Sequence, residues 1–150
     1  MQISFSLNLP RDEASVPVVR KISGDALRSL GVEDDCVGDI ELAVTEACTN
    51  VLKHAVGTAV DYEVSVKVDE SVCSIRVIDA GAGFDHAEWP AGPVQQNAES
   101  GRGIHLMSAL VDELHFVSRP ETGTIVHLEK NLDLTETAIL GKLAQRPAVG

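Results

Sequence analysis

Hydrophobic residues recur at steps of three and four in one stretch of the chain, which is the spacing of the buried face of an α-helix. We therefore predict a core-facing helix from Asp39 to Ala55, preceded by an acidic segment, residues 33–35, that would complement the positive end of its dipole. The stripe that predicts this buried face is Val37, Ile40, Val44, Ala47, Val51 and Ala55.

A second strip of the same helix carries polar side chains. Glu46 and Asn50 lie one above the other on it, because a four-residue step returns to within about 40° of the same direction. Asp39 and Lys53 fall on this strip as well, one or two turns away. An acid, an amide and an ammonium group on one line of a buried helix indicate a candidate site.

The remaining elements follow from the same two periodicities. Alternating or continuous apolar runs predict strands, and steps of three and four predict helices. The first helix begins at Ser15, has the apolar stripe Val19, Ile22, Ala26, Leu27 and Leu30, and stops at Gly31. A later helix opens at Gly101 and runs through Leu114. The predicted strands are residues 3–9, 61–68, 72–78, 115–118 and 124–130.

This order of elements has no regular alternation of strand and helix, which points to an α+β fold. We predict a two-layer α/β sandwich, with helices on one face of a mixed, mostly antiparallel sheet. The domain would span residues 1–132, and residues 133–150 would form a C-terminal tail. Residues 84–100 show no periodicity, and so long a stretch in a compact domain is typical of a lid or a binding loop.

Composition narrows the functional classes. The chain has 150 residues, of which 44% are hydrophobic and 23% charged, as in ordinary soluble domains, and no apolar run approaches a membrane span. No secretory signal is visible, and the three cysteines lack metal-binding or paired spacing, so we expect a cytoplasmic protein. A net charge of −11 with 3% aromatic residues argues against nucleic-acid binding and suits a partner protein with a basic surface.

The strand at 72–78 runs directly into Asp79-Ala80-Gly81-Ala82-Gly83. Asp79 can accept a hydrogen bond from an exocyclic amine such as that of adenine, and Gly81 and Gly83 let the backbone approach a flat ligand. The alternative is a loop in which the glycines only turn the chain and the aspartate caps it. The motif alone does not decide between the two.

Two further groups suit a nucleotide triphosphate. Gly101-Arg102-Gly103 at a helix start offers free N–H groups and a fixed charge to an anion. On the long helix, Asn50 offers an oxygen to Mg²⁺, Glu46 a general base and Lys53 a charge for phosphate. The alternative for the glycine motif is a helix entry with a solvated arginine. The alternative for Glu46 and Asn50 is a solvated helix face, which is what such a pair by itself mostly indicates. Cys48 we expect to be a small buried residue.

Four motifs in this order resemble the Bergerat-fold ATPases, the superfamily of DNA gyrase, histidine kinases and MutL. They resemble more closely the bacterial anti-sigma factors that are also serine-protein kinases. The motifs are Glu46-Ala47-Cys48-Thr49-Asn50 with Lys53-His54-Ala55, Asp79 to Asp85, Gly101 to Met107, and Gly123-Thr124-Ile125-Val126.

The resemblance implies binding of ATP and Mg²⁺, with Glu46 as the catalytic base and Asn50 as the metal ligand. Asp79 would read adenine, and Thr124 would place a hydroxyl beneath it. The nucleotide-binding residues would be Asn50, Lys53, Asp79, Gly81, Gly83, Gly101, Arg102, Gly103, Ile104 and Thr124. Members of the family form homodimers, bind a sigma factor and phosphorylate a serine of a small anti-anti-sigma antagonist.

Two other functions remain to be separated from this kinase. A nucleotide-gated regulator would bind the same partners without transferring phosphate, since binding motifs do not imply turnover. The ATP-binding half of a histidine kinase is disfavoured because the segment from Met1 to Thr45 contains no histidine.

Overall fold

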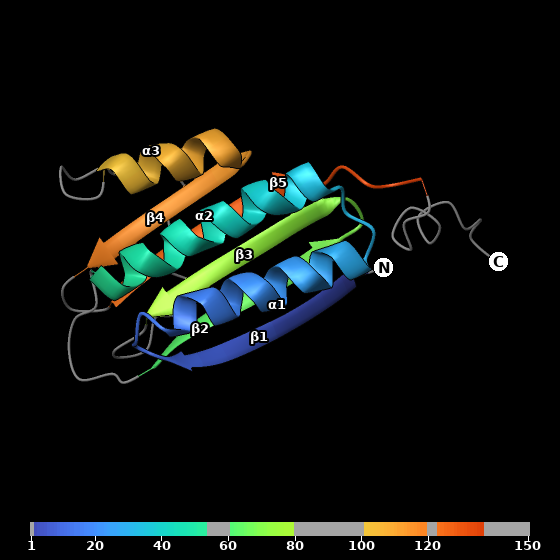
Figure 1. The fold of residues 1–150 in the computed structure, drawn as a ribbon. Helices are drawn as coiled ribbons and strands as arrows, with labels where there is room; N and C mark the ends of the chain where they lie inside the picture. The colour runs from blue at the N-terminus through green and yellow to red at the C-terminus, as the bar shows by residue number, and fades with distance from the viewer. Residues whose placement is uncertain (1, 54–60, 80–100, 120–122, 137–150) are drawn as a thin grey trace.

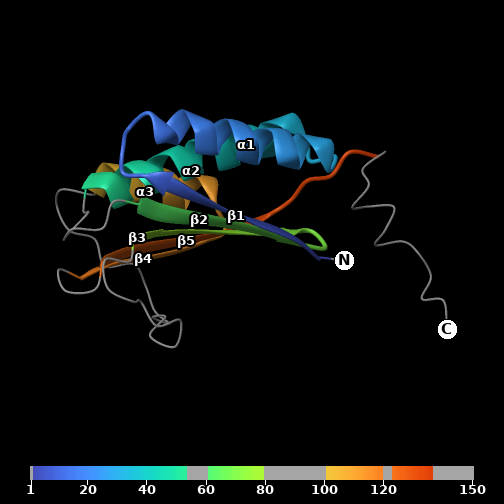
Figure 2. The ribbon, with the colours of Figure 1, turned by 90° about the horizontal axis from the view of Figure 1, so that it is seen from below.

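The computed structural model describes residues 2–53, 61–79, 101–119 and 123–136. The described elements are β1 (Gln2–Pro10), α1 (Ser15–Ser29), α2 (Asp34–Lys53), β2 (Asp61–Asp69), β3 (Val72–Asp79), α3 (Gly101–Leu110), β4 (Glu113–Arg119) and β5 (Gly123–Asn131). The three helices lie side by side in one layer over one face of the sheet (Figures 1 and 2). The predicted two-layer α+β sandwich is confirmed.

The five strands pair in the order β1-β2-β3-β5-β4. Every pairing among them is antiparallel, so the described part contains no parallel pair of the predicted mixed sheet. Helix α2 packs on the central strands β3 and β5 and contacts α1 on one side and α3 on the other. This central position buries one long face of α2.

Alternation along the strands builds the core. In β1 and β2 the apolar residues of adjacent strands face each other, as in the pairs Phe5–Val66 and Leu7–Val64. The predicted buried face of the long helix is confirmed, because its side chains are at most 2% exposed over the described part of α2. These residues are Val37, Ile40, Val44, Ala47 and Val51; Ala55 lies outside the described residues.

Three predicted details of the helices were wrong. α2 begins at Asp34 rather than Asp39, so Asp34 and Asp35 lie within its first turn, where they complement the helix dipole. Ile22 of α1 is 40% exposed, because the core face of α1 runs instead through Val19, Ser23 and Leu27. The sequence pattern, which was based on apolar residues alone, did not include Ser23 in the buried face.

α3 ends at Leu110 rather than at Leu114. The N–H of Asp112 donates to the carbonyl of Glu129 at 2.9 Å, and the strand β4 begins at the next residue. Leu114 therefore pairs with Leu128 in the β4–β5 ladder. Pairing with β5 overrides the helical periodicity of the sequence at this point.

The chain after β5 returns to the turn between α1 and α2. Leu134 forms a bridge with Val32, and the N–H of Thr135 donates to the carbonyl of Gly31 at 2.8 Å. Gly31 has a φ of 89°, which glycine adopts without strain, and it stops α1 as predicted. The division at residue 132 stays a prediction, and residues 137–150 lie outside the described part.

Candidate nucleotide site

Helix α2 carries the first part of the candidate site on its last two turns. Asn50 is 3% exposed, and its Nδ2 atom has no hydrogen-bond partner within the described part of the chain. Glu46, one turn earlier, is half-buried, and Lys53, the last residue of α2, is exposed. A buried amide with an unpaired donor is uncommon in proteins, and such groups frequently mark functional sites.

The β3–β5 pair carries the second part. Asp79 ends β3 and lies opposite Thr124 in the antiparallel register, and both side chains are fully buried. Nη2 of Arg11 forms an ion pair with Oδ1 of Asp79. Oδ2 of Asp79 is buried and has no hydrogen-bond partner among the described residues. The carboxylate therefore retains an acceptor position for a ligand.

A cavity of about 710 Å³ lies between the start of α1 and the end of α2. Its walls include Arg11, Val16, Thr49, Leu52 and Lys53. Its volume is in the range of small-molecule pockets. Among the predicted site residues whose side chains the structure describes, Lys53 alone lines this cavity, and Arg11, another wall residue, contacts Asp79. We therefore treat it as a neighbour of the candidate nucleotide site.

The structure describes some of the remaining predicted site residues and leaves others outside its described ranges. A helix begins at Gly101, as the sequence predicted for Gly101, Arg102 and Gly103. The surroundings of these side chains and of Ile104 are not described. Gly81, Gly83 and the predicted lid at 84–100 lie outside the described residues. Asn50, Asp79 and Thr124 are thus the predicted ligand-binding residues that the structure shows to be buried.

Cys48 lies between Glu46 and Asn50 in sequence but plays no part in the polar strip. Its side chain is fully buried, and burial raises the pKa of its thiol to about 12. A thiol that holds its proton at neutral pH is a poor nucleophile. The prediction that Cys48 is a small buried residue is confirmed.

The residues present fit a Mg²⁺ ion that arrives with a nucleotide. No group of three or more acidic, histidine or cysteine side chains in the described part could hold a metal alone. Mg²⁺ needs no such group, because it keeps several waters and binds one or two protein oxygens together with substrate phosphates. The carboxamide oxygen of Asn50 is a suitable protein ligand for this arrangement.

Sequence reasoning missed Arg11. This residue lies in the turn between β1 and α1, in no motif and on no helical stripe. One signal was available, because a carboxylate at the end of an apolar strand requires a compensating cation. The sequence has twelve lysines and arginines, and only the strand order shows which of them reaches Asp79.

Comparison with known proteins agrees with the fold. Residues 9–130 match the family described as "Histidine kinase-like ATPase domain". The chain is 34% identical over 140 residues to serine-protein kinase RsbW of Bacillus velezensis, covering 86% of each chain. It is 32% identical over 140 residues to RsbW of Bacillus subtilis, again covering 86% of each.

Two further matches extend the comparison. Anti-sigma F factor of Pasteuria penetrans is 32% identical over 101 residues, which cover 63% of this chain and 67% of that protein. The crystal structure of the RsbU and RsbW domains of Rv1364c from Mycobacterium tuberculosis superposes with a TM-score of 0.66 at 20% identity. This match covers 87% of the present chain and 32% of the other, and it supports the fold.

These matches define the class of the protein. It is a histidine kinase-like ATPase domain, with the antiparallel sheet and the layer of helices described above. Within that class the chain belongs to the RsbW family of serine-protein kinases. No helix in the described ranges is long and apolar enough to cross a membrane.

Proposed function

We propose that this protein is an ATP-dependent serine/threonine-protein kinase that also acts as an anti-sigma factor. It would sequester a sigma factor and phosphorylate a serine of an anti-anti-sigma antagonist. The observation that carries the proposal is the pair of buried polar groups on packed elements, Asn50 on α2 and Asp79 on β3, each with an unpaired atom. The names of the relatives, RsbW and anti-sigma F factor, support the choice of substrate and partner.

Each residue has a proposed role in binding. Asp79 accepts a hydrogen bond from the adenine amine, and Thr124, its neighbour on β5, places its hydroxyl beneath the ring. Lys53 contributes a charge to the phosphates, and Asn50 holds Mg²⁺ through its carboxamide oxygen. The nucleotide would also contact the glycine-rich segments, through Gly81, Gly83, Gly101, Arg102, Gly103 and Ile104.

Glu46 is the proposed catalytic base. It lies one turn before Asn50 on α2, at the distance along a helix that lets two side chains face one ligand. From there it would accept the proton of the attacking serine hydroxyl as phosphate is transferred. When bound, Mg²⁺ neutralises charge on the transferred phosphate.

The proposal extends to assembly and location. We propose that the protein is a cytoplasmic homodimer that binds proteins and neither nucleic acid nor membrane. Its net charge of −11 favours partners with a basic surface and repels phosphate backbones.

The test has two stages. Calorimetry of the folded protein with Mg²⁺ and ATP should show binding, and its absence at millimolar ligand would contradict the nucleotide site. Radiolabelled ATP is then added with the small antagonist protein that co-purifies from the native host. Transfer of label to that protein supports the kinase and excludes a regulator that only binds nucleotide.

The variant Glu46→Gln tests whether Glu46 is the catalytic base. This variant should bind ATP as the wild type does but transfer label at least about a hundredfold more slowly, the usual contribution of a general base. The matched control is Glu33→Gln, at an exposed position before α2, which should transfer label at the wild-type rate. Wild-type transfer by Glu46→Gln would show that another group takes the proton.

A further inference from the structure

Arg11 and Asp79 form an ion pair between two segments that are 68 residues apart in sequence. Arg11 follows directly after the edge strand β1, and Asp79 is the last residue of β3. Strand β2 lies between these two strands, so Arg11 reaches Asp79 past the start of β2, where Asp61 pairs with Pro10. The side chain of Arg11 is 13% exposed and that of Asp79 is fully buried.

The pair leaves the two carboxylate oxygens in different situations. A buried carboxylate is tolerated only where a cation or hydrogen-bond donors replace the water that it loses. Arg11 binds Oδ1 of Asp79, whereas Oδ2 has no hydrogen-bond partner within the ranges that the structure describes. One oxygen is therefore held by Arg11, and the other is a buried acceptor without a donor among the described residues.

The strand order separates the arginine from the rest of the site. Arg11 reaches Asp79 from the β2 side of β3. Thr124 lies directly opposite Asp79 on the other neighbouring strand, β5. The proposed adenine position beside Thr124 is therefore on the other side of β3 from the strands that lead to Arg11.

We propose that Arg11 is a positioning residue for adenine recognition. By binding Oδ1 it fixes the orientation of the Asp79 carboxylate, so that Oδ2 accepts a hydrogen bond from the exocyclic amine of adenine. This inference rests on the proposed nucleotide-reading role of Asp79. A carboxylate held in this way accepts hydrogen bonds and donates none, so it rejects a purine that has a carbonyl in place of the amine.

The experiment compares ATP with inosine triphosphate, which differs at this exocyclic position. Dissociation constants for both are measured with Mg²⁺ on proteins whose folding is checked by circular dichroism. The wild type should prefer ATP, and Arg11→Ala should reduce that preference by about tenfold or more, as expected when a polar contact loses its alignment. Arg11→Lys should restore most of it. The matched control Arg20→Ala, on the exposed side of α1, should keep the wild-type preference.

Asp79→Ala, which removes the acceptor, separates failure of this inference from failure of the proposed function. If the wild type shows no preference, or if a folded Asp79→Ala keeps it, Asp79 does not read adenine. If Asp79→Ala abolishes the preference while a folded Arg11→Ala keeps it, the role of Arg11 is overturned. Tighter binding of ATP by Arg11→Ala also overturns it, because Arg11 would then compete with the nucleotide.

Arg11→Ala leaves a buried carboxylate without its cation and is the variant most at risk of unfolding. Arg11→Met keeps most of the apolar length of the side chain but has no hydrogen-bond donor, and it provides the same measurement in that case. A preference for ATP reduced in Arg11→Met and restored in Arg11→Lys supports the inference. An unchanged preference in a folded Arg11→Met contradicts it.

Discussion

Gly24 of α1 lies against the carboxylate of Glu41 on α2. A Cβ atom at position 24 would lie 2.9 Å from Cδ of Glu41 and 3.1 Å from Nη1 of Arg28. Both of these atoms are at the ends of flexible side chains. The close approach of α1 and α2 therefore depends on a residue without a side chain, next to an ion pair that can move.

This relationship predicts the effect of Gly24→Ala. Alanine favours the helix over glycine by about 1 kcal/mol, but the new methyl group displaces Glu41 from Arg28. In the protein with Glu41 present, we expect Gly24→Ala to raise the free energy of unfolding by less than about 1 kcal/mol. In a Glu41→Ala background, the same substitution should raise it by the full amount of about 1 kcal/mol. Urea unfolding of the wild type, the two single variants and the double variant measures the difference. Equal gains in both backgrounds would show that Glu41 does not resist the methyl group.

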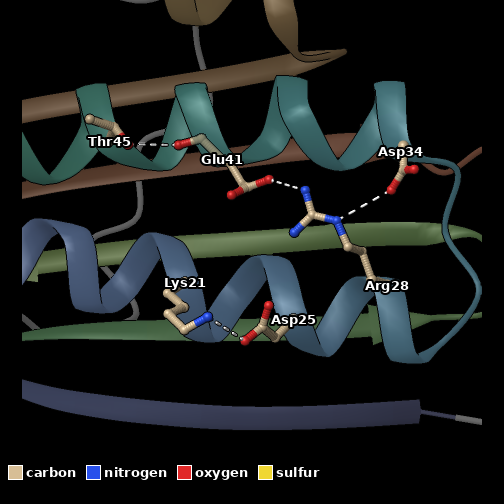
Figure 3. A network of polar contacts seen from close by, with 6 residues as sticks. All are labelled: Lys21, Asp25, Arg28, Asp34, Glu41 and Thr45. Carbon is tan, nitrogen blue, oxygen red and sulfur yellow. Dashed lines mark hydrogen bonds and ion pairs between the residues drawn. The ribbon is translucent and has the colours of Figure 1, made fainter.

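Arg28 joins α1 to the start and middle of α2 (Figure 3). Its Nη2 lies 2.6 Å from Oε1 of Glu41, and its Nε lies 3.3 Å from Oδ1 of Asp34. The pKa of Arg28 is raised, chiefly by the hydrogen bond to Glu41. Because these groups are partly or largely exposed, their attraction is screened by salt.

We therefore expect Arg28→Ala to lower the melting temperature slightly in dilute buffer and not in 1 M NaCl, where the screening length is about 3 Å. The control is Lys21→Ala, which breaks the more exposed pair with Asp25 within α1. Its effect should be smaller in dilute buffer. A loss for Arg28→Ala that is equally large in 1 M NaCl would mean that packing of the side chain, and not charge, is responsible.

Stability should fall in alkaline solution because the thiols of Cys36, Cys48 and Cys73 are buried. Burial raises the pKa of both Cys48 and Cys73 from 9.0 to about 12. The folded protein keeps these protons above pH 9, whereas the unfolded chain releases them. The stabilisation is thus complete below pH 9 and is lost between pH 9 and about 12, at up to about 1.4 kcal/mol per pH unit for each thiol.

Urea unfolding at pH 8.0 to 10.0, in steps of roughly half a unit, measures this slope. The double variant Cys48→Ala/Cys73→Ala should be less stable at pH 8 but should lose stability more slowly as the pH rises. An identical slope for both proteins would exclude the thiols of Cys48 and Cys73 as its cause.

We expect Asn50 to lower the free energy of unfolding of the protein while it contributes to ligand binding. Its unpaired, buried Nδ2 has lost its hydration without gaining a partner in the described part, at a cost of about 1–3 kcal/mol. Asn50→Ala should therefore be about as stable as the wild type or slightly more stable, while magnesium-dependent ATP binding is lost. The control is the neighbouring Val51→Ala, which should lose about 2 kcal/mol through the cavity that it creates. A comparable loss for Asn50→Ala would indicate a structural role.

The sequence predicted the elements well wherever a periodic pattern was long. The apolar stripe of α2 and the alternation in β2 each extend over several turns or residue pairs, and the structure buries both. The ends of elements were less predictable, because they depend on partners far away in sequence. β5 converts Leu114 from a helical to a strand residue, and the burial of Ser23 moves the core face of α1 away from Ile22.

The candidate site was predictable in part for the same reason. Asn50 was singled out because it shares a polar strip of its helix with Glu46, and Asp79 because it ends an apolar strand before two glycines. The structure buries both side chains. Arg11 was not recognisable, because its role depends on β1 and β3 being separated by only one strand. The order of the strands is a property of the folded sheet and is not visible in the sequence pattern.

The attachment of residues 133–135 to the turn between the first two helices bears on how shortened versions of the protein should be designed. A chain cut after Leu132 would lose the Asp133 carbonyl that accepts from Glu33 and the Thr135 amide that donates to Gly31. The bridge from Leu134 to Val32 would be lost with them. Crystallisation or expression trials should therefore retain the chain through Glu136, and purification tags belong beyond that point.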